Sequence, residues 1–360
     1  MAVARPKVRS RAGGAAIPLD EVDKRVMNLL QSSFPLDPEP YRLIAAEAGL
    51  EVDELLSRTR RLLDERIIRE ITPIFDTRAL GYESMLVAAK VDSENPQRAA
   101  RVINSHPGVS HNYLRTHEFN LWFTIATPPD SELGLEGTLE TLQRLTGAES
   151  IRQLPTLRLF KINMNLEMEK DTEALASAVD AAPPRELEAQ PYDERDIAMI
   201  RALQGPMEVV DRPYDDAAAE VGMATADFLA HLGSMVKRKL LRRVAAILYH
   251  RRAGFSANGM GVWRVPEDRI VEVGSRMAAV RGISHCYQRP TYPDWPYSVF
   301  TMAHGRSKQE CDAILDRIAD EHRLHGDDRA TLYSSTEFKK IRLHYFTDDY
   351  AAWEQEHAGA

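Results

Sequence analysis

Between residues 19 and 71, the hydrophobic positions follow a helical period three times and then change to a strand-like run. A first helix is expected after Asp20, because aspartate caps helix starts, and a second helix from residue 41 up to Gly49. A third helix begins near residue 52 and carries its apolar residues at i, i+3, i+4 and i+7 spacing. Residues 67–71 then predict a strand. Three helices followed by a β-ribbon are the pattern of a winged helix-turn-helix.

The pattern from residue 84 to residue 166 alternates strands with helices. In chain order it predicts a strand, a helix, two strands paired through a short turn, a helix and a final strand: residues 84–91, 97–105, 109–116, 120–127, 135–146 and 158–166. The order βαββαβ predicts a ferredoxin-like unit.

The second half of the chain repeats landmarks of the first half at near-constant spacing. The matching pairs are Asp20 with Asp193, Gly49 with Gly222, Gly81 with Gly254, His111 with His285, and Phe160 with Phe338. Such spacing indicates an internal duplication. The expected fold class is therefore α+β, a tandem duplication of a winged helix-turn-helix and a ferredoxin-like domain.

The expected domains follow from this repeat and from a segment rich in Glu, Ala, Asp and Pro near the middle of the chain. They are a disordered basic tail at 1–16, winged helix-turn-helix domains at 17–76 and 191–248, ferredoxin-like domains at 77–168 and 249–347, a linker at 169–190 and a tail at 348–360.

The composition narrows the class of protein. The chain has 360 residues, is 44% hydrophobic and carries a formal charge of −8, which argues against a general nucleic-acid binder. Its two cysteines, Cys286 and Cys311, form no zinc-finger pattern and suit a reducing cytoplasm. No apolar run reaches the roughly 20 residues of a membrane span, and the basic N-terminus is not followed by the apolar core of a secretory signal.

The residues of the helix-turn-helix pattern do not favour DNA binding. The groove-facing end of the first recognition helix would carry Glu51, Asp53 and Glu54, which repel phosphate. The equivalent helix of the second half, residues 225–236, contains no lysine or arginine. We expect these domains to serve packing and to shape a neighbouring site.

Two equivalent stretches concentrate the polar chemistry. Strand periodicity places His111, Tyr113, Arg115 and His117 on one face, beside an apolar wall that includes Trp122. The alternative is a solvated polar face whose histidines are merely hydrogen-bonded. The second half repeats the alternation and its aromatic surroundings with His285, Tyr287, Arg289, Trp295 and His304.

A third cluster, His250, Arg251 and Arg252, has only Arg78 as its counterpart in the first half. Arginine suits bidentate carboxylate binding, and histidine exchanges protons near neutral pH. Together these residues favour a ligand with several carboxylates and a reaction that needs a proton. No P-loop, dinucleotide-binding, zinc-protease or nucleophile-elbow motif is present. A role for one of the histidines as an axial haem ligand is left open.

At this level of detail the chain resembles a known family. The Lrp/AsnC-like layout combined with HNYLRTHEFNLWFT and FKI resembles the α-type subunit of siroheme decarboxylases. The motifs LYHRRAGFSANGMGVW, SHCYQRPTYPDWPY, FTMAHGRS and EFKK resemble the β-type subunit. The resemblance covers nearly all of residues 19–346, with both subunit types fused in one chain.

The resemblance implies a carboxy-lyase of haem biosynthesis that converts siroheme to 12,18-didecarboxysiroheme without oxidation. It implies His117 or His285 as the proton donor, with His111, Tyr113 and Tyr287 as further catalytic candidates. Substrate-binding candidates are Arg115, His250, Arg251, Arg252, Arg289, Trp122, Trp295 and His304. No metal or cofactor is expected beyond the iron of the substrate.

Siroheme is the expected partner, a homodimer is left open, and neither nucleic acid nor membrane is expected to bind. A transcriptional regulator of the Lrp/AsnC type that senses haem or an amino acid is the alternative.

Overall fold

The N-terminal helices form where local chemistry favours their ends. The computed structural model describes residues 19–32, 34–162, 189–249 and 257–357. Before helix α1 (Glu21–Ser32), the backbone N–H of Asp23 donates to Asp20 at 2.6 Å, which caps the helix. Helix α2 (Pro40–Ala48) starts on a proline and ends at Gly49, whose φ of 70° suits glycine. Helix α3 (Val52–Asp64) completes the helix-turn-helix.

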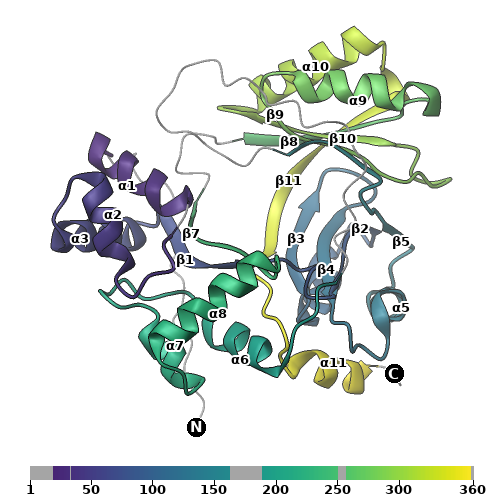
Figure 1. Cartoon of the computed structure of the whole chain (residues 1–360). Helices are drawn as coiled ribbons and strands as arrows, with labels where there is room; N and C mark the ends of the chain where they lie inside the picture. The colour runs from purple at the N-terminus through teal and green to yellow at the C-terminus, as the bar shows by residue number, and fades with distance from the viewer. Residues whose placement is uncertain (1–18, 33, 163–188, 250–256, 358–360) are drawn as a thin grey trace.

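The two helix-turn-helix units share one β-ribbon and one core. Strand β1 (Ile68–Phe75) pairs antiparallel with β7 (Leu241–Leu248) of the other half. Helices α6 (Glu194–Leu203), α7 (Asp215–Glu220) and α8 (Thr225–Lys237) complete the second unit. The helices of both units lie around the β1–β7 ribbon (Figure 1), and buried residues of both halves form a single hydrophobic core. Each half therefore supplies one strand of a joint ribbon.

The remaining elements build the two ferredoxin-like units. The first contains β2 (Glu83–Lys90), α4 (Pro96–Ser105), β3 (Val109–Arg115), β4 (Leu121–Thr127), α5 (Gly134–Thr146) and β5 (Ser150–Gln153), followed by β6 (Arg158–Ile162). The second contains β8 (Ala257–Trp263), α9 (Ile270–Ala279), β9 (Ile283–Gln288), β10 (Val299–Gly305), α10 (Lys308–His322) and β11 (Arg329–Lys340), and helix α11 (Asp349–His357) follows. Within the described ranges, no helix combines the length and hydrophobicity that crossing a bilayer requires.

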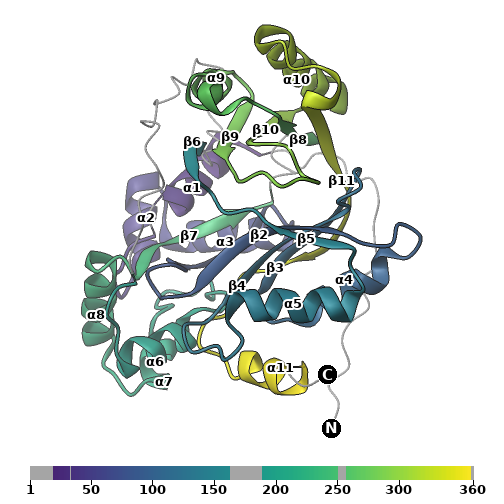
Figure 2. The same ribbon diagram turned by 90° about the vertical axis from the view of Figure 1, so that its right-hand side faces the viewer.

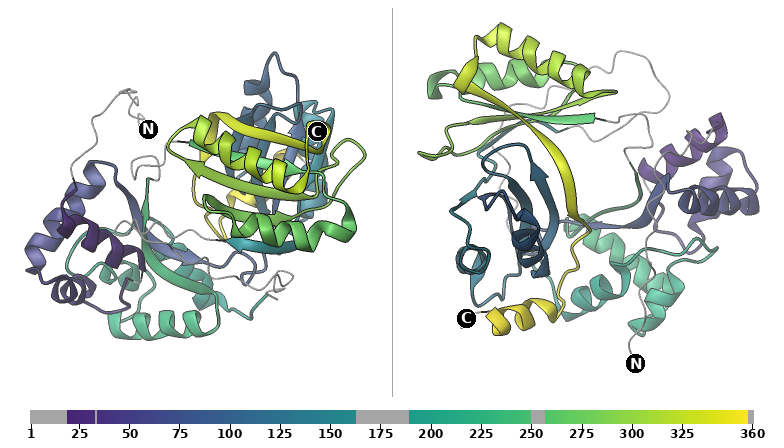
Figure 3. Two further views of the ribbon diagram at one scale, coloured as in Figure 1. Left: turned by 90° about the horizontal axis from the view of Figure 1, so that it is seen from above. Right: turned by 180° about the vertical axis from the view of Figure 1, so that it is seen from behind.

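The described strands of both units join into one nine-stranded sheet, in the order β5-β2-β4-β3-β11-β8-β10-β9-β6. The strand expected at 158–166 as the last of the first unit instead pairs with β9 of the second unit, and the short strand β5 closes the first unit. Pro155 lies in the connector between β5 and β6 and has no N–H to donate to a ladder. Strand β11 makes the equivalent crossing without a break, pairing first with β8 and then with β3 (Figure 3).

The sheet is covered by helices on one face of each unit and by the opposite unit on the other. Helices α4 and α5 pack on the first unit, and α9 and α10 on the second (Figure 2). The helix-free faces share a further core, which we call the inner core. It contains Ala88, Phe119, Trp122, Leu154, Met260, Val262, Trp295, Phe300 and Leu332.

Candidate active site

The chemically rich stretch of the first half lies on the helix-free face of its strand. On β3, the side chain of Asn112 points to the helical side, where it donates to Asn104 at 3.0 Å. The alternating residues His111, Tyr113 and Arg115 therefore lie on the inner face, as strand geometry requires. The second half repeats this placement on β9, where buried Cys286 packs on the helical side.

Arg115 and Arg289 each reach across to the opposite half. Arg115 Nη1 donates to the carbonyl of Leu332 at 3.2 Å, and Arg289 Nη1 donates to the carbonyl of Leu154. The guanidinium carbons lie 5.6 Å from the Trp122 ring centroid and 5.5 Å from that of Phe300, respectively. Burial lowers the pKa of both arginines to about 10, so both stay charged at neutral pH.

The Nε atom of each of these arginines is buried and has no hydrogen-bond partner. A buried charged donor without an acceptor is costly unless a ligand or water satisfies it. In both guanidinium groups, Nη1 is thus used in a hydrogen bond within the protein, and Nε is still able to donate to a ligand.

The histidines on the inner face are held by hydroxyl groups. His111 Nδ1 lies 2.9 Å from Ser110 Oγ and 3.4 Å from Thr124 Oγ1. In the second half, His285 Nδ1 lies 2.6 Å from Ser284 Oγ, which contacts His304 Nε2 at 2.7 Å. The latter contacts form a relay of two imidazoles through one hydroxyl. Burial lowers the pKa of both His111 and His285 to about 4.

His117 lies at the turn between β3 and β4, where the two halves meet. Its Nδ1 accepts the backbone N–H of Phe119 at 3.1 Å, and its ring packs edge-on against Trp295 at 5.2 Å. Burial lowers the pKa of His117. Trp295 and Trp122 are fully buried in the inner core, with their rings 5.3 Å apart. These tryptophans form part of the apolar inner core beside the histidines and arginines.

A cavity of about 540 Å³, the central cavity, opens on the inner face of the first unit. It is lined by Arg78, Gly81, Tyr82, Glu83, Ser84, Met85, Leu86, Thr124, Leu154, Pro155, Thr156, Ala189 and Arg289. Arg289 comes from the second half and all the other lining residues up to Thr156 from the first. The cavity is therefore composite. Thr124 brings His111 next to it through their contact.

Several predicted site residues lie away from this cavity. Arg115 contacts Leu332 on the opposite half, and His285, Tyr287 and His304 lie on the second unit. His250, Arg251 and Arg252 lie outside the described residues.

Sequence reasoning did not select Arg78 or Thr124 as site residues. The signal for Arg78 was its position in the turn equivalent to the arginine-rich segment of the second half. Thr124 carried no comparable signal, because a threonine on a strand is ordinary.

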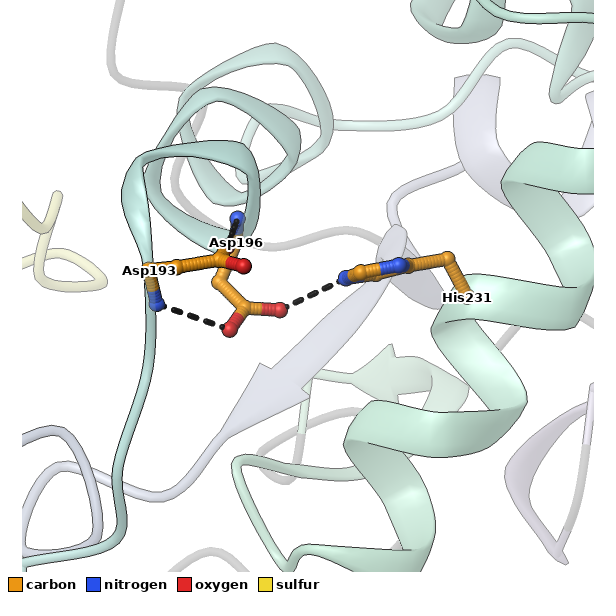
Figure 4. Close-up of side chains that lie close together, drawn as sticks. All are labelled: Asp193, Asp196 and His231. Carbon is orange, nitrogen blue, oxygen red and sulfur yellow. Dashed lines mark hydrogen bonds and ion pairs between the residues drawn. The ribbon is translucent and has the colours of Figure 1, made fainter.

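One group of described residues, Asp193, Asp196 and His231, has the spacing of metal ligands (Figure 4). The oxygens of Asp196 already accept from His231 Nε2 and from both terminal nitrogens of Arg238, each at 2.7 Å. Burial alone would raise the pKa of Asp196, but these hydrogen bonds lower it to about 2. In the first half the equivalent Asp23 accepts from Arg58, which stands at the position of His231. The group is a repeated helix-capping ion pair.

Comparisons with known proteins agree over most of the chain. The family model of the AsnC-like ligand binding domain matches residues 79–161 and 252–339, and that of the siroheme decarboxylase NirDL-like HTH domain matches residues 23–69. The chain is 39% identical to a siroheme decarboxylase from Hydrogenobacter thermophilus, over 94% of this chain and 98% of that protein. It is 39% identical to a siroheme decarboxylase alpha subunit from Oleidesulfovibrio alaskensis, which covers 43% of this chain and is itself covered to 93%.

The crystal structure of the siroheme decarboxylase NirDL superposes with a TM-score of 0.74 at 34% identity, covering 94% of this chain and 99% of that one. A second crystal structure of NirDL, in complex with an iron-uroporphyrin III analogue, superposes with the same TM-score at 33% identity.

Proposed function

The chain belongs to the siroheme decarboxylase family, and on this premise we propose that it decarboxylates siroheme to 12,18-didecarboxysiroheme. In this proposal it is a carboxy-lyase that converts two acetate side chains to methyl groups without an oxidant. The observation that carries the proposal is the composite central cavity, in which Arg78 of one half and Arg289 of the other line a single space beside the inner core. The complex of NirDL with an iron-uroporphyrin III analogue supports a tetrapyrrole as the ligand.

The cavity suits a flat ligand that carries carboxylates at its edge. Met85, Leu86 and Leu154 offer apolar wall, and guanidinium groups bind carboxylates with a planar, two-pronged geometry. The buried, unpartnered Nε of Arg289 would gain an acceptor from such a carboxylate. Binding would therefore remove the energetic cost of leaving this buried N–H without an acceptor.

The reaction needs electron acceptance and one proton per acetate. When CO₂ leaves, the C–C bond electrons remain on the methylene carbon, and the conjugated pyrrole can accommodate them. A proton then forms the third C–H bond of the methyl group. Positioned proton delivery contributes about 10²–10⁴-fold to rate.

We propose His111, His117 and His285 as candidates for this proton delivery. His111 has the closest described link to the central cavity, through Thr124. His285 is supported by its relay to His304, and His117 by its position against Trp295 at the meeting of the halves. The tyrosines Tyr113 and Tyr287 pack beside His111 and His285, with ring centroids 6.2 and 6.0 Å apart.

The iron belongs to the substrate, and the chemistry above calls on no other cofactor. We place the protein in the cytoplasm, because its acidic composition and its two free, buried cysteines suit a reducing compartment. Alpha and beta subunits exist as separate relatives, so the fused halves correspond to a heterodimer, and a further homodimer stays a prediction.

Replacing Arg78 tests the cavity assignment. Arg78 is exposed and its side chain lines the cavity, so Arg78→Gln is expected to raise the KM for siroheme by about tenfold through loss of one charge-assisted hydrogen bond. The control is Arg195→Gln, which removes an exposed arginine of α6 outside the cavity. Equal KM values for the two variants would refute the assignment.

A further inference from the structure

A second cavity, of about 670 Å³, adjoins the central cavity. Leu154 to Thr156 line the central cavity, Leu157 lines the second, and Arg289 lines both. Three further arginines, Arg264, Arg269 and Arg323, line the second cavity, against two carboxylates, Glu267 and Asp328. We call it the arginine cavity. It carries an excess of positive charge in a chain whose formal charge is −8.

Arg264 can be compared with its counterpart in the first half. Tyr113 pairs with Trp122, and its counterpart Tyr287 pairs with Phe300, so Trp122 and Phe300 are equivalent. Their partners on the next strand, Ala88 and Val262, are therefore equivalent as well. Two residues further along each strand, Lys90 corresponds to Arg264. Lys90 forms ion pairs with Glu149 at 3.0 Å and Glu118 at 3.2 Å. Arg264 forms no ion pair with any carboxylate of the described residues. The second half has kept the positive charge and lost its neutralising partners.

Arg269 replaces a helix cap. In the first half Asn95 precedes α4, and its side chain accepts the backbone N–H of Arg98. Arg269 precedes α9 at the equivalent position and makes no capping hydrogen bond. A positive side chain at a helix N-terminus also opposes the helix dipole. This position therefore gives up local stability.

Arg323 replaces a glycine. Helix α5 ends at Gly147 with a φ of 70°, and α10 ends at Arg323 with a φ of 57°. The two helix ends are closed by equivalent hydrogen bonds. The backbone N–H of Ala148 donates to the carbonyl of Gln143, and that of Leu324 donates to the carbonyl of Ala319. The left-handed conformation suits glycine and strains other residues, and such strain persists where function requires it.

Three positions around one cavity thus carry arginine where the duplicated half carries a paired lysine, a capping asparagine and a left-handed glycine. Resting on the proposed function, we propose that the arginine cavity binds the carboxylates of a tetrapyrrole. The shared chemistry is a polycarboxylate held by exposed guanidinium groups next to Arg289. Its source is either the far edge of the molecule in the central cavity or a second molecule, and the two sources predict different stoichiometries.

Titration with iron uroporphyrin III, an iron tetrapyrrole with many carboxylates, tests the proposal on the full chain. The variant combines Arg264→Gln, Arg269→Gln and Arg323→Gln, and the control combines Arg195→Gln, Arg281→Gln and Arg317→Gln, three exposed arginines away from both cavities. We expect roughly tenfold weaker binding for the variant and a change below twofold for the control. Affinities within twofold of wild type for both would overturn the proposal.

The stoichiometry separates the two sources. A fall from two bound molecules to one identifies a second molecule, and weaker binding at unchanged stoichiometry identifies the far edge of the substrate. If the wild-type chain fails to decarboxylate siroheme, the proposed function fails; a wild-type chain that is active while the variant binds normally sinks only the arginine cavity.

Arg323→Gly tests whether weaker binding by the triple variant could result from misfolding. Glycine fits the left-handed conformation, so this variant is expected to raise the melting temperature while it weakens iron uroporphyrin III binding. A variant that is more stable and binds with wild-type affinity would contradict a ligand role for Arg323.

Discussion

Arg115 and Arg289 each use part of their hydrogen-bonding capacity to join the two halves. One terminal nitrogen of each guanidinium group joins the two halves through a backbone carbonyl, and the Nε remains buried without an acceptor. Arg289 lines both cavities, and its counterpart Arg115 lines neither. In the proposed function, Arg289 therefore links assembly of the halves to substrate binding.

Ligand binding should change the protonation of His111. Burial, together with Lys340 and Arg69, lowers the pKa of His111 to about 4, so the free protein holds it neutral at pH 7. A carboxylate placed beside Thr124 would favour the charged form and raise this pKa. Binding of iron uroporphyrin III should therefore take up protons and strengthen as the pH falls from 8 to 6. Calorimetry in buffers of different ionisation enthalpy measures the uptake, and equal uptake by wild type and His111→Gln would refute this role.

Loss of a proton donor should affect turnover and leave binding intact. We expect His117→Ala or His285→Ala to lower kcat for siroheme decarboxylation by about 10²–10⁴-fold, with little change in tetrapyrrole affinity. Single-turnover kinetics and absorbance titration provide the two readouts. Unchanged turnover in both variants would remove these two histidines from the proton-delivery step.

At the residue scale, sequence periodicity located the chemistry but not all its neighbours. The alternation of His111, Tyr113 and Arg115 correctly predicts a shared strand face, because side-chain direction on a strand is local geometry. Thr124 and Arg78 line the central cavity together with Arg289, which reaches it only through the approach of the two halves. That approach depends on long-range packing, which no local pattern records.

At the scale of elements, the turn at 76–82 is held by a buried aspartate, Asp76. Buried Asp76 accepts the backbone N–H groups of Arg78 and Ala79 at 3.0 and 3.1 Å, and its other oxygen accepts Arg242 Nε at 2.8 Å. Arg242 comes from β7 of the second half. The position equivalent to Asp76 is Tyr249, which carries no negative charge. The shared ribbon therefore fixes a wall of the central cavity.

Loss of the Asp76–Arg242 ion pair should affect substrate binding more than the rate of the chemical step. Asp76→Asn keeps the turn's backbone acceptor but removes the charge that holds Arg242, so we expect the KM for siroheme to rise by roughly threefold to tenfold at nearly unchanged kcat. Arg242→Gln should show the same split. Arg243→Gln, a neighbouring exposed change on β7, is the control. A pure fall in kcat for Asp76→Asn would contradict a positioning role.

The elements also show where sequence patterns fail. The strand at 158–166 was predicted as the end of the first unit, yet β6 pairs with β9 of the second unit and the four-residue strand β5 takes its place. A strand pattern predicts extended backbone and leaves its partner undetermined. The helices were predictable because caps at Asp20 and Gly49 and the apolar spacing are local signals.

At the scale of the whole molecule, the two halves depend on each other. The β1–β7 ribbon, the β3–β11 and β6–β9 pairings and the inner core all join residues from opposite halves. Each half alone would expose these strand edges and apolar faces to water.

Separating the halves should therefore give mutually dependent fragments. Fragments 1–175 and 176–360 are expected to copurify in equal amounts when coexpressed and to aggregate when expressed singly, because the shared cores account for much of the buried surface. Size-exclusion chromatography with light scattering checks the result. A single fragment that is monomeric and cooperatively folded would show that the halves are independent.

The helix-turn-helix units should not bind DNA strongly. Helix α3 carries Asp53 and Glu54 in its first turn, both exposed. Of its three arginines, Arg58 and Arg61 are engaged with Asp23, and Arg60 donates to the carbonyl of Val209. We expect no salt-dependent shift of DNA from the upstream region of its own gene at micromolar protein. A shift that weakens steeply with salt would revive the regulator alternative.

Mass analysis of the reaction product tests the proposed decarboxylation of siroheme. Purified wild-type chain is incubated with siroheme without oxygen in D₂O, and the tetrapyrrole is analysed by mass spectrometry. We expect loss of two CO₂ and gain of one solvent deuteron in each new methyl group, with Arg78→Gln slower than Arg195→Gln. Siroheme that keeps all its carboxylates under these conditions would refute the proposed decarboxylation.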